Sequence, residues 1–199
     1  MAHFFRSSGY LQDDPVVCGD GTVLSVAGLP PFLRTLMVAD GTVTKSLEAW
    51  FWEPVKVAPL HQKRLFLEAA LPLLEVEAGA EVLQREVCLT GSRTGRDYAC
   101  ARSLLLLSAL PAGMREGMLE GRIGIGELLR EQGVETYREI VDLGYLPAGT
   151  ERDALLARFE GDLVSRAYRI RVAGEPAILV SEFFPLAVYQ SDGLVAGGG

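Results

Sequence analysis

Residues 82–107 read VLQREVCLT, GSRTG and RDYACARSLLLL in succession. The first and last of these segments are mostly apolar, with occasional charged residues, as partly buried strands are. The middle segment, 91–95, has five residues and two glycines, a length and composition typical of hairpin loops. The sequence therefore predicts an antiparallel hairpin formed by residues 82–90 and 96–107.

Strand-like patterns are present in three further places: 51–58, 134–145 and a second hairpin of 167–172 with 177–189. Pro54 would confine the first of these to an edge or to a bulge, because proline cannot donate to a ladder. Residues 62–78 fit a helix and a strand equally well. These patterns predict a sheet built mainly from hairpins.

Helical patterns cover 32–38, 43–49, 111–119 and 126–132, with a helical turn at 153–159. Pro31 suits a first helical turn, where its missing N–H is harmless. Thr42 could cap the second helix through its hydroxyl group. Hairpins with helices inserted at a few points predict an α+β fold, with a single antiparallel β-sheet that carries helices on one face.

The chain has 199 residues, of which 49% are hydrophobic and 23% charged, as expected for one globular domain. We expect a loosely ordered N-terminal arm (1–28), a domain (29–192) and a glycine-rich disordered tail (193–199). A net charge of −7 argues against a nucleic-acid partner, which requires a basic surface. The sequence has neither a signal-peptide pattern nor an apolar run long enough for a membrane span, so we expect a cytoplasmic location.

Familiar catalytic signatures such as GxSxG, the P-loop and HExxH do not occur in the sequence, which has only two histidines. Cys18, Cys88 and Cys100 are an odd number of cysteines without CxxC spacing. We therefore expect reduced, buried thiols rather than a disulfide or a zinc site. Any chemistry would rest on arginine, glutamate, tyrosine and backbone groups, since two histidines do not suggest a histidine metal site.

Two arginines lie inside the predicted hairpin, Arg85 in its first strand and Arg102 in its second. By the two-residue period of a strand, Arg102 shares a face with Tyr98 and Cys100. If both arginines point inward, an anionic ligand such as a carboxylate would supply the charge that the apolar interior lacks. The alternative is that Arg85 pairs with a nearby acid such as Glu86 on a solvated face.

Glu182 interrupts the apolar run of the last predicted strand. It is either a residue of the solvated face or a buried acid that forms hydrogen bonds or transfers a proton. The segment GRIGIG (121–126) precedes a predicted helix and leaves the backbone N–H groups near Ile125 accessible to an anion. It could equally be a glycine-rich connector without a ligand.

Four segments, in this order, resemble the chorismate pyruvate-lyase family: LPPFL with DGTVTK (29–45), LQREVCL with YACARS (83–103), LEGRIGIGE (119–127) and the closing stretch from YRI to SEFFP (168–185). The resemblance spans about residues 29–190. It implies a compact α+β domain with an enclosed ligand cavity under two helical flaps. It also implies a carbon–oxygen lyase that converts chorismate, its small-molecule partner, into 4-hydroxybenzoate and pyruvate without a cofactor.

The resemblance also implies roles for individual residues. Arg85 is similar to the arginine that binds the ring carboxylate, and Glu182 to the acid that hydrogen-bonds the ring hydroxyl. Val43 and Ile125 match the flap positions whose backbone N–H groups face the same carboxylate. Arg102 resembles a second cavity arginine, suited to the enolpyruvyl carboxylate.

Two other functions are compatible with the same residues. One is a sensor domain that binds an aromatic carboxylate without turnover, since effector domains of some bacterial transcription regulators share a related fold. The other is a family member that acts on a related substrate in a specialised pathway. The sequence leaves the oligomeric state open.

Overall fold

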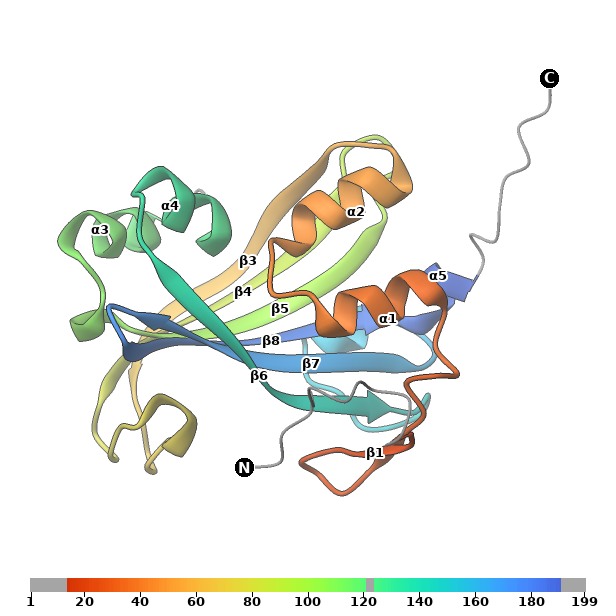
Figure 1. Cartoon of the computed structure of the whole chain (residues 1–199), viewed down its shortest axis with the longest axis horizontal. Helices are drawn as coiled ribbons and strands as arrows, with labels where there is room; N and C mark the ends of the chain where they lie inside the picture. The colour runs from red at the N-terminus through yellow and green to blue at the C-terminus, as the bar shows by residue number, and fades with distance from the viewer. Residues whose placement is uncertain (1–13, 121–123, 191–199) are drawn as a thin grey trace.

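The computed structural model describes residues 14–120 and 124–190. Its main sheet has six strands in the order β3-β4-β5-β8-β7-β6, and every neighbouring pair is antiparallel (Figure 1). The strands are β3 (Val55–Phe66), β4 (Glu81–Gly91), β5 (Asp97–Leu106), β6 (Thr136–Leu146), β7 (Leu163–Val172) and β8 (Glu175–Pro185). The predicted α+β fold around one large antiparallel sheet is confirmed.

Short helices and a small ladder complete the described chain. They are α1 (Pro31–Val38), α2 (Val43–Phe51), α3 (Ala112–Glu120), α4 (Ile125–Glu131), α5 (Leu186–Gln190), the 3-10 turns η2 (Pro72–Leu74), η3 (Leu107–Ala109) and η4 (Leu156–Arg158), and the strands β1 (Val16–Val17) and β2 (Val23–Leu24). Figure 1 shows α3 and α4 together, apart from α1 and α2. Among these helices, none is long and apolar enough to cross a bilayer.

Both predicted hairpins are present, as β4–β5 and β7–β8. The prediction for 51–58 was wrong at its start, because α2 continues to Phe51 and β3 begins only at Val55. Phe51 stacks on Tyr98 with ring centroids 3.8 Å apart, so packing against the sheet extends the helix beyond its sequence pattern. Thr42 precedes α2 as expected, but its hydroxyl group makes no capping hydrogen bond to the helix.

The edge position of this strand is confirmed. β3 pairs only with β4 in the described sheet, and its register shifts between Pro59 and His61. The ambiguous segment 62–78 splits, since β3 extends to Phe66 and a loop containing η2 follows. Proline is tolerated in β3 because the strand has one unpaired side.

The four helices α1 to α4 cover one face of the sheet in two groups. The first core, beneath α1 and α2, joins helix residues to one end of the strands and includes Leu33, Leu36, Leu47, Leu89, Ala99, Val164 and Phe184. The second core, beneath α3 and α4, includes Met114, Met118, Leu128, Leu83, Leu105, Ile170 and Ile178. Leu83 and Leu89 lie on the same face of β4 because their spacing is even. The two cores are therefore neighbours along one face of the sheet.

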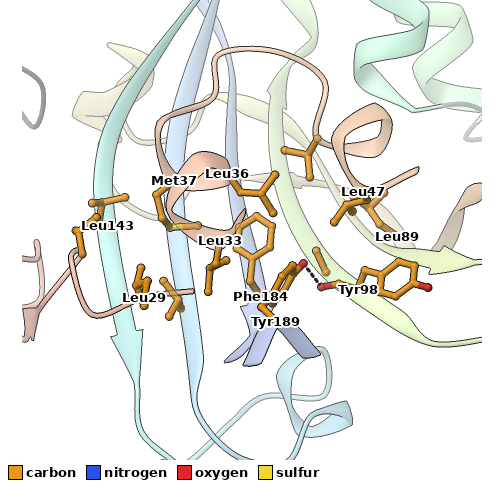
Figure 2. Close-up of a cluster of buried hydrophobic side chains, with 14 of the residues drawn as sticks. Leu29, Leu33, Leu36, Met37, Leu47, Leu89, Tyr98, Leu143, Phe184 and Tyr189 are labelled. Atoms are coloured by element: carbon orange, nitrogen blue, oxygen red, sulfur yellow. Dashed lines mark hydrogen bonds between the residues drawn. The ribbon is translucent and has the colours of Figure 1, made fainter. Parts of the chain in front are cut away.

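Figure 2 shows the first core, with α1 side chains pointing onto the sheet. Phe184 of β8 and Tyr189 of α5 pack edge to face, with ring centroids 6.1 Å apart. The Tyr189 hydroxyl donates to the backbone carbonyl of Tyr98 at 2.7 Å, so its polar end is satisfied inside the apolar cluster (Figure 2). This bond ties α5 to β5.

Glu53 connects the turn after α2 to the β4–β5 loop. Its carboxylate accepts hydrogen bonds from the backbone N–H groups of Arg93 and Thr94 and from the Thr94 and Tyr98 hydroxyls. A Cβ at position 91 would lie 2.4 Å from Glu53 Oε1, so only Gly91 allows this approach. These bonds lower the pKa of Glu53 to about 2, the Tyr98 hydroxyl being the largest cause.

Residues 14–28 belong to the stretch expected as a loosely ordered arm. They form the β1–β2 ladder, and Cys18, Leu24 and Val26 are buried in the first core. The Gly19 N–H donates to Asp142 Oδ1 of β6 at 2.8 Å. This part of the chain is packed against the sheet, whereas residues 1–13 and the expected tail lie outside the described residues.

The expectation of three unbonded thiols was wrong for two of them. Cys88 of β4 and Cys100 of β5 are directly opposite each other in the ladder and form a disulfide, with 4.0 Å between their Cα atoms. They lie on the face away from the helices, with Leu155, Leu156 and Leu163. This pairing depends on the register of the hairpin, which the spacing of the cysteines along the chain does not reveal. Cys18 is a buried free thiol.

Candidate functional site

A cavity of about 410 Å³ lies between the two cores on the helical face of the sheet. The first turns of α2 and α4 line it, together with side chains from β3, β4, β5, β6, β7 and β8. Arg85, Val43, Ile125 and Glu182, four of the five residues singled out from the sequence, line this one cavity. Regions far apart in the sequence therefore meet at one site.

A band of polar residues crosses the sheet at the level of the cavity. Arg85 of β4 is opposite Ser103 of β5, Ser103 is opposite Val180 of β8, and Val180 is opposite Tyr168 of β7. The next row along the strands contains Val87, Ala101, Glu182 and Arg166. We call Arg85, Ser103, Tyr168, Arg166 and Glu182 the polar band. It separates the apolar rows of the first and second cores.

Arg85 points into the interior and not onto a solvated face. Its side chain is only 2% exposed and lines the cavity, and its Nη1 lies 3.9 Å from Met118 Sδ of α3. Burial lowers the pKa of the Arg85 guanidinium, because desolvation disfavours its charged form. Arginine nevertheless remains protonated in proteins, so the cavity contains a cation. The acid suggested as its alternative partner, Glu86, binds Arg102 instead.

Arg102 was expected in the cavity but lies on the opposite face of the sheet. It pairs with Glu86 in the ladder, one residue out of step with Arg85 and Ser103. Its Nε lies 2.8 Å from Glu86 Oε1 and its Nη2 lies 2.6 Å from Asp153 Oδ2. The structure thus places Arg102 in an ion-pair network outside the cavity.

Glu182 is buried on the cavity side of β8, at 5% exposure. Its Oε2 accepts a hydrogen bond from Arg166 Nε at 2.8 Å, and its Oε1 accepts one from the Tyr168 hydroxyl at 3.1 Å. A buried carboxylate needs such partners, since its desolvation is costly. Of the two readings of Glu182, the structure supports the buried acid.

The sequence did not single out Arg166 or Tyr168. Arg166 is 1% exposed, and its guanidinium also donates to the backbone carbonyls of Leu36 and Ala39 at the end of α1. Burial raises the pKa of Tyr168, and the charge of Glu182 raises it further, so Tyr168 is a hydrogen-bond donor throughout the physiological range. The hairpin register was the available signal, because pairing β7 with β8 places Arg166 opposite Glu182.

The flap positions Val43 and Ile125 are the first residues of α2 and α4. N–H groups in a first helical turn have no intrahelical partner and are available to an anion. A Cβ on Gly126 would lie 3.2 Å from Thr42 Oγ1, so the two helix starts approach each other closely. Residues 121–123 of the expected glycine-rich segment lie outside the described residues.

Arg138 of β6 is a further cation at the cavity that sequence reasoning missed. Its Nη1 donates to the Asp40 carbonyl at 2.7 Å, in the connection between α1 and α2. Its Nε is buried without a hydrogen-bond partner among the described residues. Arg138 therefore retains a donor in a partly buried position.

One group of potential metal ligands is present in the described part of the chain. Cys88, Asp97 and Cys100 offer donor atoms within 4.8 Å of one another. The two sulfur atoms are bonded to each other, and Asp97 accepts hydrogen bonds from Thr90 and Arg158. This group therefore does not offer thiolates to a metal ion.

Residues 37–191 match the family described as Rv2949c-like chorismate pyruvate-lyase. The chain is 30% identical over 160 residues to a chorismate pyruvate-lyase of Mycobacterium leprae (strain TN), covering 79% of this chain and 76% of that protein. It is 28% identical over 169 residues to one of Mycobacterium tuberculosis (strain ATCC 25618 / H37Rv), covering 79% and 81%. The effector domain of PhnF from Mycobacterium smegmatis has the same fold, with a TM-score of 0.56 at 18% identity over 74% of this chain and 90% of that chain. By the family match and the identity to these relatives, the chain belongs to the Rv2949c-like chorismate pyruvate-lyase family.

Proposed function

We propose that this protein is a chorismate pyruvate-lyase, which converts chorismate into 4-hydroxybenzoate and pyruvate. The observation that carries the proposal is the presence of Arg85 and Glu182 in one cavity. They are two strands and two residues apart in the ladders, a Cα separation of about 12 Å by ordinary sheet spacing. The cavity of about 410 Å³ leaves room between them for a six-membered ring with a carboxylate at one end and a hydroxyl at the other.

In this proposal Arg85 binds the ring carboxylate through charge-assisted hydrogen bonds. The backbone N–H groups of Val43 and Ile125 face the same carboxylate from the starts of α2 and α4. Glu182 accepts a hydrogen bond from the ring hydroxyl. The ring is thereby fixed at both ends, and only its ether substituent changes position as the reaction proceeds.

Chorismate carries a second carboxylate on its enolpyruvyl group, which needs a second cation. Arg138 meets this need in our proposal, since it lines the cavity and its buried Nε has no partner among the described residues. Arg130 of α4 lines the same part of the cavity and adds positive charge. These two residues take the place that the sequence had suggested for Arg102.

The reaction removes a ring hydrogen and the enolpyruvyl ether, and the ring becomes aromatic. Most of the driving force therefore lies in the substrate, and the protein orients the ether and excludes water. Two routes are compatible with the cavity, a base-assisted elimination and a direct transfer of the hydrogen to the enolpyruvyl methylene. Neither needs a metal ion or an organic cofactor.

The direct test is to incubate purified protein with chorismate and to separate the products by chromatography. Equal amounts of 4-hydroxybenzoate and pyruvate, formed without added metal, are expected. Thermal stabilisation by 4-hydroxybenzoate without turnover would indicate a binding domain or an enzyme for a related substrate. The absence of both turnover and stabilisation would overturn the proposal.

A further inference from the structure

Arg166 holds Glu182 from one side and the helical layer from the other. Its Nε donates to Glu182 Oε2 at 2.8 Å, and its Nη1 donates to the carbonyls of Leu36 and Ala39. These carbonyls end α1, where the helix dipole favours a positive charge. The guanidinium carbon also lies 5.1 Å from the centre of the Tyr168 ring. Arg166 is therefore fixed by contacts on several sides.

The charged and titratable groups around Glu182 come from several elements. β7 contributes Arg166 and Tyr168, α5 contributes Tyr189, and Arg138 of β6 and Arg85 of β4 line the same cavity. Arg166 is the cation in direct contact, with both side chains almost fully buried. Without this partner, a carboxylate at such a position would be neutralised by a proton.

The state of Glu182 decides what it can bind. An ionised carboxylate only accepts hydrogen bonds, whereas a protonated one can also donate. Tyr168 already donates to Oε1, and the carboxylate can accept a further hydrogen bond from a donor in the cavity. A ligand with a hydroxyl or amino group at this end donates the missing hydrogen bond to Glu182. A ligand without a donor leaves the buried carboxylate next to an apolar atom, which costs binding free energy.

We propose that Arg166 is a positioning residue that keeps Glu182 ionised and fixed, so that this end of the cavity selects ligands that donate a hydrogen bond. The inference rests on the proposed function in taking a ring carboxylate as the ligand. It adds a specificity determinant that touches no ligand itself and acts through Glu182.

The test compares 4-hydroxybenzoate with 4-fluorobenzoate, which has nearly the same size but no donor. Dissociation constants are measured by calorimetry between about pH 6 and pH 8, where both probes keep an ionised carboxylate and the phenol stays protonated. The wild-type protein should bind the hydroxy compound roughly 10- to 150-fold more tightly, the value of one hydrogen bond to a charged group. This ratio should be independent of pH, because Arg166 is in direct contact with the Glu182 carboxylate.

In Arg166→Gln the ratio should depend on pH. It should fall about 5-fold below the wild-type value at the acid end and recover as the pH rises, because a buried carboxylate is harder to keep charged without its cation. Arg166→Lys restores the charge and should restore a ratio that does not vary with pH. Tyr168→Phe is the matched control. It removes the other hydrogen bond to Glu182 but leaves the charge of Arg166 in place, so its ratio should not vary with pH.

A folded Arg166→Gln protein with the wild-type ratio at every pH would overturn the proposal, as would a wild-type ratio near one. If Arg166→Gln does not fold, the binding ratio of Glu182→Gln tests the proposal instead. This variant imitates the uncharged acid and should show the low ratio at every pH, and a wild-type ratio in Glu182→Gln would overturn the proposal.

Chorismate turnover, measured on the same wild-type sample, separates this inference from the proposed function. Selection for donor ligands without turnover would support the role of Arg166 and overturn the lyase activity. Turnover combined with equal binding of both benzoates would overturn the role of Arg166 alone. A wild-type protein that binds neither benzoate would overturn it as well.

Discussion

Arg85 and Arg102 lie on opposite faces of the β4–β5 ladder. Arg85 pairs with Ser103 and faces the cavity, whereas Arg102 pairs with Glu86, one position along, and faces away from the helices. Both arginines interrupt the same apolar hairpin, and only the register distinguishes them. They therefore form a matched pair for mutagenesis, one inside the proposed site and one outside it.

Arg85→Ala should remove the anchor of the ring carboxylate. Losing this buried charge-assisted contact should reduce transition-state stabilisation by about 2–4 kcal/mol, which lowers kcat/KM by roughly 30- to 1,000-fold. Steady-state kinetics with chorismate measure the effect. Arg102→Ala is the control and should keep kcat/KM within a few-fold of wild type, because its partners lie outside the cavity. Wild-type turnover by a folded Arg85→Ala protein would refute the assignment of Arg85.

Glu182→Gln should lower kcat more than it weakens the binding of 4-hydroxybenzoate. The amide keeps the size of the side chain and one acceptor oxygen, but it loses the charge that faces the ring hydroxyl. A fall in kcat of about 10-fold or more is expected, the value of a hydrogen bond to a charged group. Turnover and product affinity are compared in the same preparation. Equal losses in both would point to a role in binding alone.

The fold could be predicted from local patterns, but the faces of β5 could not. The register passes from Leu89 opposite Ala99 to Thr90 opposite Asp97, so Tyr98 has no partner in the ladder and forms a bulge. The bulge breaks the two-residue alternation, and Tyr98 lies in the first core while Cys100 lies on the other face. A strict alternation had placed both on the face of Arg102.

The candidate site was only partly predictable for a similar reason. Arg85 and Glu182 are charged residues inside apolar strands, a local signal that the sequence displays. The role of Arg166 depends on its hydrogen bonds to the carbonyl of Leu36, 130 positions away, and to Glu182 across a hairpin. The contact with Leu36 depends on tertiary packing and leaves no local pattern, whereas the contact with Glu182 follows from the register of the β7–β8 hairpin.

Gly126→Val should disturb the close approach between the first turns of α2 and α4. An added Cβ at Gly126 would lie 3.2 Å from Thr42 Oγ1 and 3.5 Å from Arg138 Nη2, and the methyl groups of valine would extend further. Overpacking lowers stability by about 1–3 kcal/mol. Here the added atoms would displace residues that line the cavity, so KM for chorismate should rise about 5-fold or more. Gly41→Val is the matched substitution, because a Cβ at Gly41 meets no atom within 4 Å. Equal KM values for the two variants would contradict a close approach of α2 and α4.

The Cys88–Cys100 disulfide predicts one free thiol of three in the unreduced, denatured protein, that of Cys18. Alkylation followed by mass spectrometry counts the thiols directly. Replacing both bonded cysteines by alanine should lower the free energy of unfolding by about 2–3 kcal/mol, the effect of opening a loop of this length. Three reactive thiols before reduction would show that the two cysteines are not bonded.

Glu53 should make the protein sensitive to acid. Its folded-state pKa is about 2, below the ordinary value of 4.5, so its carboxylate stabilises the folded state fully above about pH 4.5. This contribution is lost as the pH falls from there through about 2, because the unfolded state binds the proton first. Urea unfolding of wild type and Glu53→Gln over this range should show a difference in stability that shrinks as the pH falls.

The exposed Glu151 provides the control for this experiment. Glu151→Gln should follow the wild-type pH dependence, because no hydrogen bond or ion pair to its side chain is found in the described structure. The four groups that donate to Glu53 all favour its ionised form, so they account for the sign of the effect. A constant difference between wild type and Glu53→Gln across the acid range would mean that Glu53 fastens the β4–β5 loop without depending on its charge.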